Sequence, residues 1–323
     1  MIAQGRLVEN FEQAVASYLQ TAGGVATGSG TAALILALKA LGVGSEDEVI
    51  LPTYVCKSVA EAVTTVGAKP VLCDVGEQWN MTAQTVAPHV NARTAAIIVV
   101  HIFGIVTDTR SFKEFNVPLI EDCCQTFGAQ IDGAYAGTVG DIGFFSFHAI
   151  KCLTTGEGGM AVTNDFHLLE IMQRLRDSAA NSIVEARLTS PMTDLQASLG
   201  LSQLARYDDF LSRRKRLADL YFNELRSCAI ELPEAVRSES IFYRFPVRSR
   251  GVFEKERERF DALGVQVRQG VDRLLHRLMN VDAELFPVAE RLFDQTVSIP
   301  LYPALPDEEA WKVIEACRVV WAA

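Results

Sequence analysis

Short, almost continuously apolar runs recur between Val49 and about Asp165 and alternate with stretches of helical pattern. The runs are VILP, PVLCDV, AAIIVVH, PLIEDC, DIGFFSF and GMAVTND. Strands without polar alternation are buried on both faces, which is typical of a largely parallel sheet. Two neighbouring stretches of helical length, TAALILALKALG and VCKSVAEAVTTVG, end on Gly42 and Gly67, and glycine suits the left-handed position after a helix. The chain is therefore predicted to be an α/β protein with helices on both sides of the sheet.

The pattern changes after about Met192, where a long charged stretch carries apolar residues near helical spacing. We interpret this stretch as a connector to a smaller C-terminal domain. That domain is predicted to contain a strand at IFYRFPVRS, a helix at FEKERERFDALG closed by Gly264, and a last helix from about Asp307. We place the large domain at residues 1–208 and the smaller α+β domain at residues 209–323.

Charge and composition argue against several classes of function. The formal net charge is −10 and the Lys and Arg residues are scattered, so binding to nucleic acid is not expected. The chain shows neither the start of a signal peptide nor an uncharged apolar run of about 18 residues, which predicts a soluble, cytoplasmic protein without membrane contact. The seven cysteines lack paired Cys-x-x-Cys spacing, so we expect reduced thiols and no metal site.

The residues Gly28-Ser29-Gly30-Thr31 follow a short strand and open a predicted helix. Small residues let a phosphate approach the backbone, and the free N–H groups at the start of a helix bind it. The same stretch through Ala33 also matches G-x-G-x-x-A, the dinucleotide fingerprint, so an NAD-type Rossmann oxidoreductase is an alternative. A ribose-binding acid should then follow the next strand, whereas Glu46, Asp47 and Glu48 precede it. A simple turn that starts a buried helix is the third interpretation.

Two further candidates follow predicted strands, at the sheet edge where α/β proteins gather ligand-binding groups. Glu121-Asp122 ends the strand PLIEDC, and a carboxylate there can cap a helix, bind a metal or pair with a protonated ring nitrogen. Lys151 follows DIGFFSF and precedes the glycine-rich turn TTGEGG. Partial burial lowers the pKa of such a lysine from about 10.4 and frees its amine to attack an aldehyde. The order of phosphate-binding turn, acid and lysine is the order that a pyridoxal-phosphate (PLP) site requires.

The chain resembles the DegT/StrS-type sugar aminotransferases, a PLP-dependent family with the aspartate-aminotransferase fold. The resemblance covers nearly the whole chain and rests on GSGTAAL, DEVILPTYV, GAKPVLCDV, VVHIFG, LIEDCCQTFGA, GDIGFFSFHAIKCLTTGEGGMAVTND, MTDLQASLGLSQL and SIPLYPALPDEE. It implies that an amino group passes from an amino acid, with glutamate as the expected donor, to a keto-sugar that is expected to be nucleotide-linked. It also implies a homodimer, because family members complete the site across a two-fold interface.

The resemblance implies roles for the acid and the lysine. Lys151 would carry the PLP as a Schiff base and move the α-proton of the donor. Asp122 would pair with the pyridine nitrogen and keep it protonated, and Gln125 would lie near the phenolic oxygen of the ring.

The phosphate site is implied in the same way. Gly30 and Thr31 would hold the phosphate through backbone N–H groups and the Thr31 hydroxyl, and Ser146 would add a second hydroxyl. Many family members add an asparagine from the neighbouring subunit, in Asn-Tyr-Arg just before MTDLQ, whereas this chain has Thr189-Ser190-Pro191 there. We expect a hydroxyl of this segment to replace part of that contact near the partner's phosphate.

One position over the cofactor ring departs from the family. Relatives tend to place an aromatic residue there, and an ungapped match puts Cys56 at this position, while Tyr54 is the alternative residue to stack on the ring. Members of the family also carry a further interface segment before the first helix. A PLP-binding regulator without catalytic activity is therefore a second alternative function, although the presence of Lys151, Asp122 and Gln125 argues against it.

Overall fold

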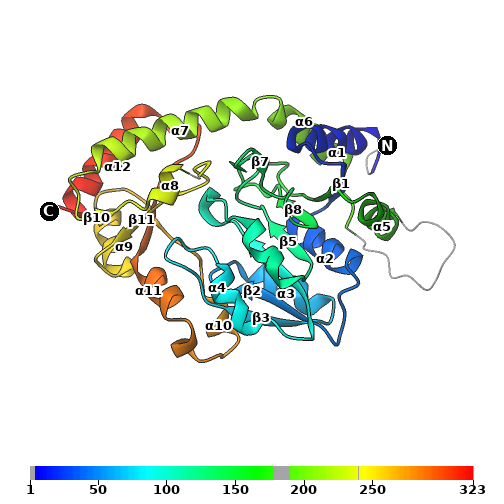
Figure 1. Cartoon of the computed structure of the whole chain (residues 1–323). Coiled ribbons are helices and arrows are strands. Elements are labelled where there is room, and N and C mark those ends of the chain that lie inside the picture. Colours follow the sequence, from blue (N-terminus) through cyan, green and yellow to red (C-terminus); the bar gives the residue numbers. More distant parts are fainter. Residues whose placement is uncertain (1–3, 178–189, 239, 323) are drawn as a thin grey trace.

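The computed structural model describes residues 4–177, 190–238 and 240–322, and its centre is a seven-stranded sheet (Figure 1). In spatial order the strands are β1 (Gly23–Thr27), β9 (Gly159–Thr163), β8 (Ile142–Ser146), β5 (Leu119–Asp122), β4 (Thr94–Val100), β2 (Glu48–Pro52) and β3 (Lys69–Cys73). Neighbouring strands from β8 to β3 are parallel, whereas β9 runs antiparallel to both β1 and β8. All six predicted runs form strands of this sheet, so the mostly parallel α/β architecture is confirmed.

Both faces of this sheet are buried. In β4, Ile98 and Val100 belong to the core that also contains α2 (Gly30–Ala40) and α3 (Lys57–Thr65). Their neighbours Ile97 and Val99 belong to a second core, together with Phe112. Because successive side chains of a strand point to opposite faces, burial on both sides explains why the strand sequences are unbroken apolar runs.

Helices flank the sheet as the sequence predicts. The helices α2 and α3 are followed by Gly42 (φ 76°) and Gly67 (φ 89°), and this left-handed backbone explains the glycine at each end. Around β1 lie α1 (Arg6–Leu19) and α5 (Phe166–Asp177). Shorter elements are α4 (Ala83–Val86), the 3-10 turns η1 (Ala87–His89), η2 (Ile102–Gly104) and η3 (Thr109–Phe115), and the hairpin of β6 (Gln130–Ile131) and β7 (Ala134–Tyr135).

The predicted connector consists of two helices, α6 (Asp194–Leu204) and α7 (Tyr207–Glu224). The helix breaks at Arg206, whose φ of −117° and ψ of 9° are not helical. Just after the break, the buried Tyr207 donates its hydroxyl to the carbonyl of Phe127 at 2.7 Å. α6 packs on α1, and α7 then spans the molecule to the small domain (Figure 1). The division at residue 208 falls in the first turn of α7 and stays a prediction.

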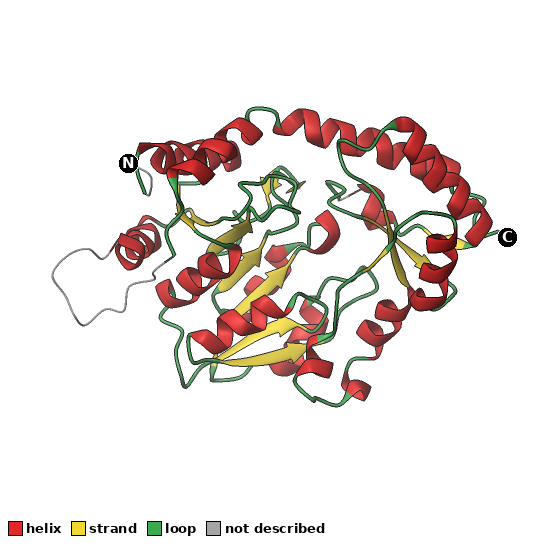
Figure 2. Ribbon diagram, turned by 180° about the vertical axis from the view of Figure 1, so that it is seen from behind, coloured by secondary structure: helices red, strands yellow, loops and turns green. Residues whose placement is uncertain are grey.

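The C-terminal part contains a second, four-stranded antiparallel sheet, which stands apart from the large one (Figure 2). Its strands, in spatial order, are β10 (Ile230–Glu231), β11 (Phe245–Ser249), β13 (Thr296–Ile299) and β12 (Arg268–Gln269). The helices of this part are α8 (Glu234–Ser238), α9 (Phe253–Ala262), α10 (Leu275–Leu278), the 3-10 turn η4 (Ala283–Leu285), α11 (Pro287–Gln295) and α12 (Asp307–Val320). The two predicted helices of this domain, which are α9 closed by Gly264 and α12 from Asp307, are confirmed.

The predicted strand IFYRFPVRS is shorter than expected, because β11 begins only at Phe245. The residues before it cross to the large domain instead. Ile241 N–H donates to the carbonyl of Gly104 at 3.1 Å, and Arg244 N–H donates to the carbonyl of Phe103 at 3.3 Å. These bonds hold the residues before β11 against the large domain.

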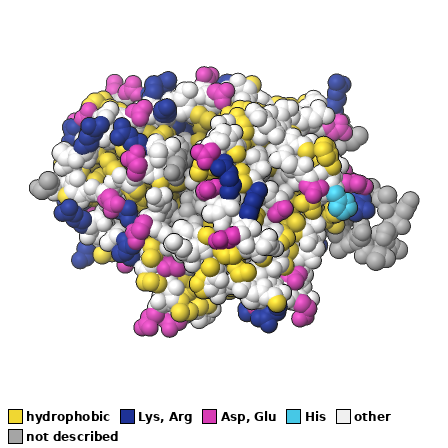
Figure 3. All heavy atoms as spheres, viewed as in Figure 1, with side chains coloured by type: hydrophobic (Ala, Val, Ile, Leu, Met, Phe, Trp, Pro, Cys, Tyr) yellow, Lys and Arg dark blue, Asp and Glu magenta, His cyan; other side chains and the backbone are white. Residues whose placement is uncertain are grey.

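Acidic and basic side chains are interspersed over the face shown in Figure 3, without a broad basic area. Along the described residues, no helix combines the length and the apolar character needed to cross a membrane.

Candidate active site

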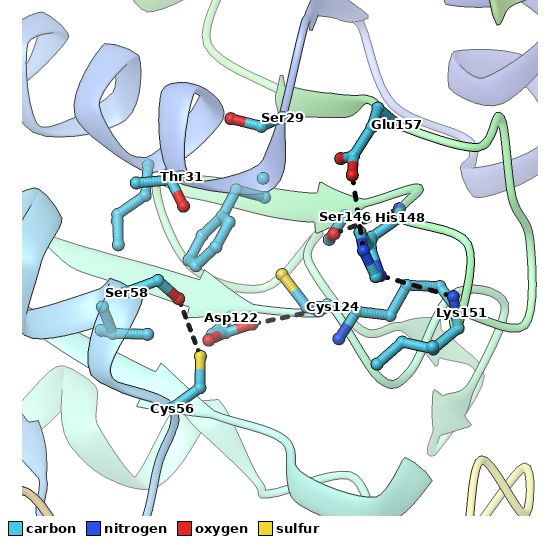
Figure 4. A pocket seen from close by; sticks show the side chains of 15 residues that line it. Ser29, Thr31, Cys56, Ser58, Asp122, Cys124, Ser146, His148, Lys151 and Glu157 are labelled. Carbon is cyan, nitrogen blue, oxygen red and sulfur yellow. Dashed lines mark hydrogen bonds and ion pairs between the residues drawn. The ribbon is translucent and has the colours of Figure 1, made fainter.

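A cavity of about 270 Å³ opens at the carboxyl ends of β5 and β8. Its walls come from the first residues of α2 and α3, from the ends of these two strands, and from the segment 148–157 that follows β8 (Figure 4). The predicted site residues that line this cavity are Gly30, Thr31, Cys56, Asp122, Ser146 and Lys151. They meet because parallel strands end at one edge of the sheet, which brings together residues that are far apart in the sequence.

The turn between β1 and α2 forms one end of the cavity. Ser29 is the N-cap of α2, and its Oγ accepts the N–H of Ala32 at 3.1 Å. A side chain is excluded at Gly30, because a Cβ there would lie 2.7 Å from the Cβ of Ser146. This close approach brings the start of α2 beside Ser146, and the hydroxyl of Thr31 lines the same cavity. Backbone N–H groups at a helix start together with two hydroxyls suit a phosphate.

The segment before α6 lies against this turn. Gly28 N–H donates to the carbonyl of Ser190 at 2.7 Å, and Thr27 forms a β-bridge with Pro191. Ser190 therefore lies beside the phosphate turn of its own chain. Thr189 lies outside the described residues, and a contact of this segment with a partner's phosphate stays a prediction.

Asp122 is the buried acid of the cavity. It is 5% exposed, and its Oδ1 accepts the N–H of Cys124 at 3.0 Å, which closes the turn after β5. Within the described residues Asp122 forms no ion pair, and its Oδ2 accepts no hydrogen bond. A buried carboxylate is costly unless a cation or a donor meets it. The unused oxygen therefore fits a protonated ring nitrogen placed in the cavity.

Glu121, the other acid of the predicted pair, does not line the cavity. Its carboxylate accepts the N–H groups of Val139 at 2.8 Å and Gly140 at 2.7 Å, and it lies 3.0 Å from Nε2 of His101. Burial acts to raise the pKa of Glu121, but His101 and the backbone N–H of Gly140 outweigh burial and lower this pKa to about 2. Glu121 is therefore an ionised structural anchor for the end of β5.

His101, Glu121 and Cys123 lie close enough together to hold a metal ion. The donor atoms of the first two are already used, because Nδ1 of His101 accepts the N–H of Thr107 at 3.0 Å and its Nε2 faces Glu121. This arrangement makes the cluster a buried hydrogen-bond network that supports the strand ends.

Lys151 lies in the turn after β8, and its ammonium group lies over the ring of Tyr243, 5.3 Å from the centroid. Burial acts to lower the pKa of Lys151, but Tyr243, Cys124, Asp122 and Cys56 outweigh burial and raise the pKa above its ordinary value of 10.5. The predicted direction of this shift is wrong, because the prediction rested on burial alone and the acidic neighbours favour the charged ammonium.

The structure separates the two candidates for stacking on the ring. Cys56 lines the cavity as the N-cap of α3, with its Sγ 2.9 Å from the Oγ of Ser58. Tyr54 is fully buried and meets the ring of Phe103 edge-on, with 6.3 Å between the centroids. Its hydroxyl is so close to Gly270 that a Cβ there would lie 1.9 Å from it. Tyr54 thus packs between the two domains and is not placed where it would stack on a ring in this cavity.

Gln125 does not line the cavity either. Its Oε1 accepts the N–H of Phe103 at 2.6 Å, which supports the left-handed backbone of Phe103 (φ 60°). A role of Gln125 near the phenolic oxygen stays a prediction. Among the lining residues that sequence reasoning missed are three polar side chains, those of Ser58, Cys124 and Glu157. Cys124 follows Asp122 by two positions, and this spacing is the signal that would have found it.

The dinucleotide interpretation of G-x-G-x-x-A is not supported. A Rossmann fingerprint needs its first strand inside a parallel βαβ unit. Here β1, the strand before the fingerprint, lies at the edge of the sheet and pairs antiparallel with β9.

Comparison with known sequences finds a family model that matches nearly the whole chain, including every residue of the site. The model of the DegT/DnrJ/EryC1/StrS aminotransferase family matches residues 1–318. A dTDP-3-amino-3,4,6-trideoxy-alpha-D-glucose transaminase of Micromonospora megalomicea subsp. nigra is 33% identical, over 98% of this chain and 90% of the relative. A GDP-perosamine synthase of Escherichia coli O157:H7 is 30% identical, over 97% of this chain and 90% of the relative.

Solved structures of aminotransferases share the fold of this chain. The aminotransferase TlmJ from Streptoalloteichus hindustanus superposes with a TM-score of 0.92 at 31% identity, covering 99% of this chain and 92% of that one. The PLP form of Spr1654 from Streptococcus pneumoniae gives a TM-score of 0.92 at 27% identity, with 99% and 92% covered.

Proposed function

Because this chain belongs to the DegT/DnrJ/EryC1/StrS aminotransferase family, we propose that it transfers the amino group of an amino acid to the keto group of a nucleotide-linked sugar. It is a PLP-dependent aminotransferase, as the resemblance implied. Relatives named as transaminases favour neither the oxidoreductase nor the non-catalytic regulator. Glutamate is the expected donor.

The observation that carries this proposal is the convergence of three chemically different groups on one cavity. PLP has a phosphate, a ring nitrogen that can be protonated, and an aldehyde. Gly30 and Thr31 with Ser146 would hold the phosphate, Asp122 the ring nitrogen, and Lys151 the aldehyde carbon. The hydroxyls, the buried carboxylate that forms no ion pair among the described residues, and the amine each fit the group assigned to them.

When bound, PLP supplies an electron sink that stabilises negative charge at the α-carbon of the donor. The carboxylate of Asp122 would hold the proton on the ring nitrogen. Nζ of Lys151 lines the same cavity and would serve as the base that accepts the α-proton of the donor. The thiol of Cys56 would cover the ring where relatives tend to have an aromatic side chain.

A half-reaction with the donor alone tests this function. We expect glutamate to remove the visible absorption band of the PLP-loaded protein, and a nucleotide-linked keto-sugar to restore it. Glutarate, which has the same carboxylates but no amine, is the matched control and should leave the band unchanged. If none of the common amino acids removes the band, aminotransfer is the wrong reaction.

We also propose a homodimer. Ile150, next to Lys151 on the cavity wall, is 62% exposed, and Leu195 in the first turn of α6 is 77% exposed. The same turn reaches the cavity wall, because Nε2 of Gln196 donates to the carbonyl of Glu157 at 2.8 Å. Large apolar side chains beside a site are typical of a subunit interface, and two-fold dimers are the commonest assemblies.

Replacing Leu195 by aspartate should shift the protein from dimer to monomer, because it would bury a charge at this interface. Light scattering over a dilution series measures the mass. The control is Val319→Asp, a 59% exposed apolar position at the end of α12, which should leave the mass unchanged. A monomeric wild-type protein with full activity at high dilution would contradict the proposal.

A further inference from the structure

The ammonium group of Lys151 has an aromatic partner from the small domain. It lies over the ring of Tyr243, 5.3 Å from the ring centroid. Lys151 lines the cavity of the candidate active site, whereas Tyr243 is not among the lining residues. Tyr243 is 7% exposed, so its ring is largely shielded from water. The quadrupole of such a ring attracts a cation over its face more strongly than that of an exposed ring.

The backbone around Tyr243 is fixed by bonds that do not involve Lys151. The buried Arg214 of α7 donates from Nη1 to the carbonyls of Phe242 at 2.8 Å and Tyr243 at 3.2 Å. In the large domain, the carbonyl of Phe103 accepts the N–H of Arg244 at 3.3 Å. Phe242 has a left-handed backbone (φ 58°), which a bulky residue keeps only where its surroundings impose it. The ring is therefore held in place before it meets the lysine.

The face of an aromatic ring attracts an ammonium group but not a neutral amine, so this contact favours one protonation state of Lys151. Burial acts to lower the pKa of Lys151, and Tyr243 makes the largest contribution against it. The other charged or titratable groups around Lys151 come from the large domain, except for Arg244, whose guanidinium lies over the same ring, 5.9 Å from the centroid. They are Asp122 at the end of β5, Cys124 in the next turn, Cys56 at the start of α3, and the His148–Glu157 pair of the cavity wall.

We propose that Tyr243 is a positioning residue for Lys151, and that the face of its ring holds the ammonium group that forms when Nζ accepts the α-proton of the donor. In this step the C–H bond of the donor breaks, an N–H bond forms at Nζ, and the electron pair of the C–H bond stays with the carbon. A ring that binds the ammonium form stabilises the product of the proton transfer. This inference rests on the proposed function, in which Lys151 is the base.

The pH dependence of amine labelling tests the contact on the full chain freed of PLP. Trace acetic anhydride acetylates only the neutral amine, so the midpoint of labelling on the peptide that contains Lys151 follows the pKa of this lysine. Tyr243→Leu removes the ring face and should lower the midpoint by about one pH unit, because the ammonium form loses a shielded cation–π contact. Tyr243→Phe keeps the ring face and should titrate like wild type.

A graded series tests the ring face without the leucine variant. Phenylalanine analogues with increasing fluorine substitution, placed at position 243, keep the shape of the ring while they weaken the negative charge of its face. The labelling midpoint of Lys151 should fall stepwise along this series. On the PLP-loaded protein, the half-reaction with glutamate should slow by about threefold or more in Tyr243→Leu, because a weaker base accepts the α-proton more slowly.

Tyr302→Leu is the matched control, because it makes the same change at a 47% exposed tyrosine of the small domain. The charge of Arg244 is common to all variants, since its Nη1 is held by the carbonyls of Gln269 at 2.9 Å and Gly270 at 3.2 Å.

The inference is overturned if the midpoint of Lys151 stays constant along the fluorinated series, or if Tyr302→Leu shifts it as far as Tyr243→Leu. It is also overturned if Tyr243→Phe shifts the midpoint as far as Tyr243→Leu, which would assign the effect to the hydroxyl. The labelling needs no reaction with an amino acid, so its outcome is independent of the half-reaction that tests the proposed function.

Discussion

Lys151→Ala protein is expected to form no covalent bond to PLP. Borohydride reduction of the wild-type protein should leave the mass of the cofactor on the peptide that contains Lys151, and the variant should carry no such label. Turnover should fall by about 10²- to 10⁴-fold or more, because the variant also lacks the base that moves the α-proton. The variant is still expected to bind PLP without a covalent bond, because Gly30, Thr31 and Ser146 remain.

Lys57→Ala is the control for this experiment. Lys57 begins α3, next to Cys56, but its ammonium points to an ion pair with Glu61 at 2.9 Å and its side chain is 72% exposed. This variant should keep both the label and the turnover. A label on any other lysine, or no label on the wild-type protein, would contradict the assignment of Lys151.

Asp122→Asn should keep the fold and bind PLP, yet lose turnover by on the order of 100-fold, or about 3 kcal/mol of transition-state stabilisation. The amide oxygen can still accept the N–H of Cys124, so the turn after β5 should stay closed. What the amide lacks is the negative charge that keeps the ring nitrogen protonated. Turnover with glutamate and a melting curve measure the two effects separately.

Asp132→Asn removes the same charge from an exposed acid that pairs with Arg110, and its turnover should match that of wild type. Near-normal turnover of Asp122→Asn would leave Asp122 with a capping role only. A large fall in melting temperature without a change in turnover would give the same answer.

The fold was predictable because its signals are local. Unbroken apolar runs such as that of β4 reflect burial on both faces, and a single stretch of sequence contains that information. Gly42 and Gly67 mark helix ends because a left-handed backbone favours glycine at one position. The first half of the predicted strand IFYRFPVRS does not form a strand, because its burial depends on contacts that are not local. Its apolar residues Ile241 and Phe242 pack at the junction with the large domain, and a pattern cannot distinguish that burial from burial in a strand.

The pKa of Lys151 shows the same difference between local and tertiary information within the site. The sequence places this lysine after a buried strand, from which partial burial and a lowered pKa follow. The charges around it are contributed by other segments, with Asp122 at the end of β5 and Tyr243 in the small domain. These neighbours reverse the direction of the shift, and their distances from the lysine are set by the packing of segments that are far apart in the sequence.

By itself the sequence determined the layered α/β architecture, the turn at residues 28–31 that opens a helix, and the position of Asp122 and Lys151 at one sheet edge, because each follows from periodicity, helix ends or strand ends within short stretches of chain. Only the tertiary structure decided that Cys56 and not Tyr54 faces the cavity, and that Arg244 lies over the same ring as Lys151. Tyr54 is turned away because its hydroxyl packs against Gly270 of the small domain. Such contacts join residues from distant parts of the chain, and their geometry is set by the packing of whole elements, which no local pattern records.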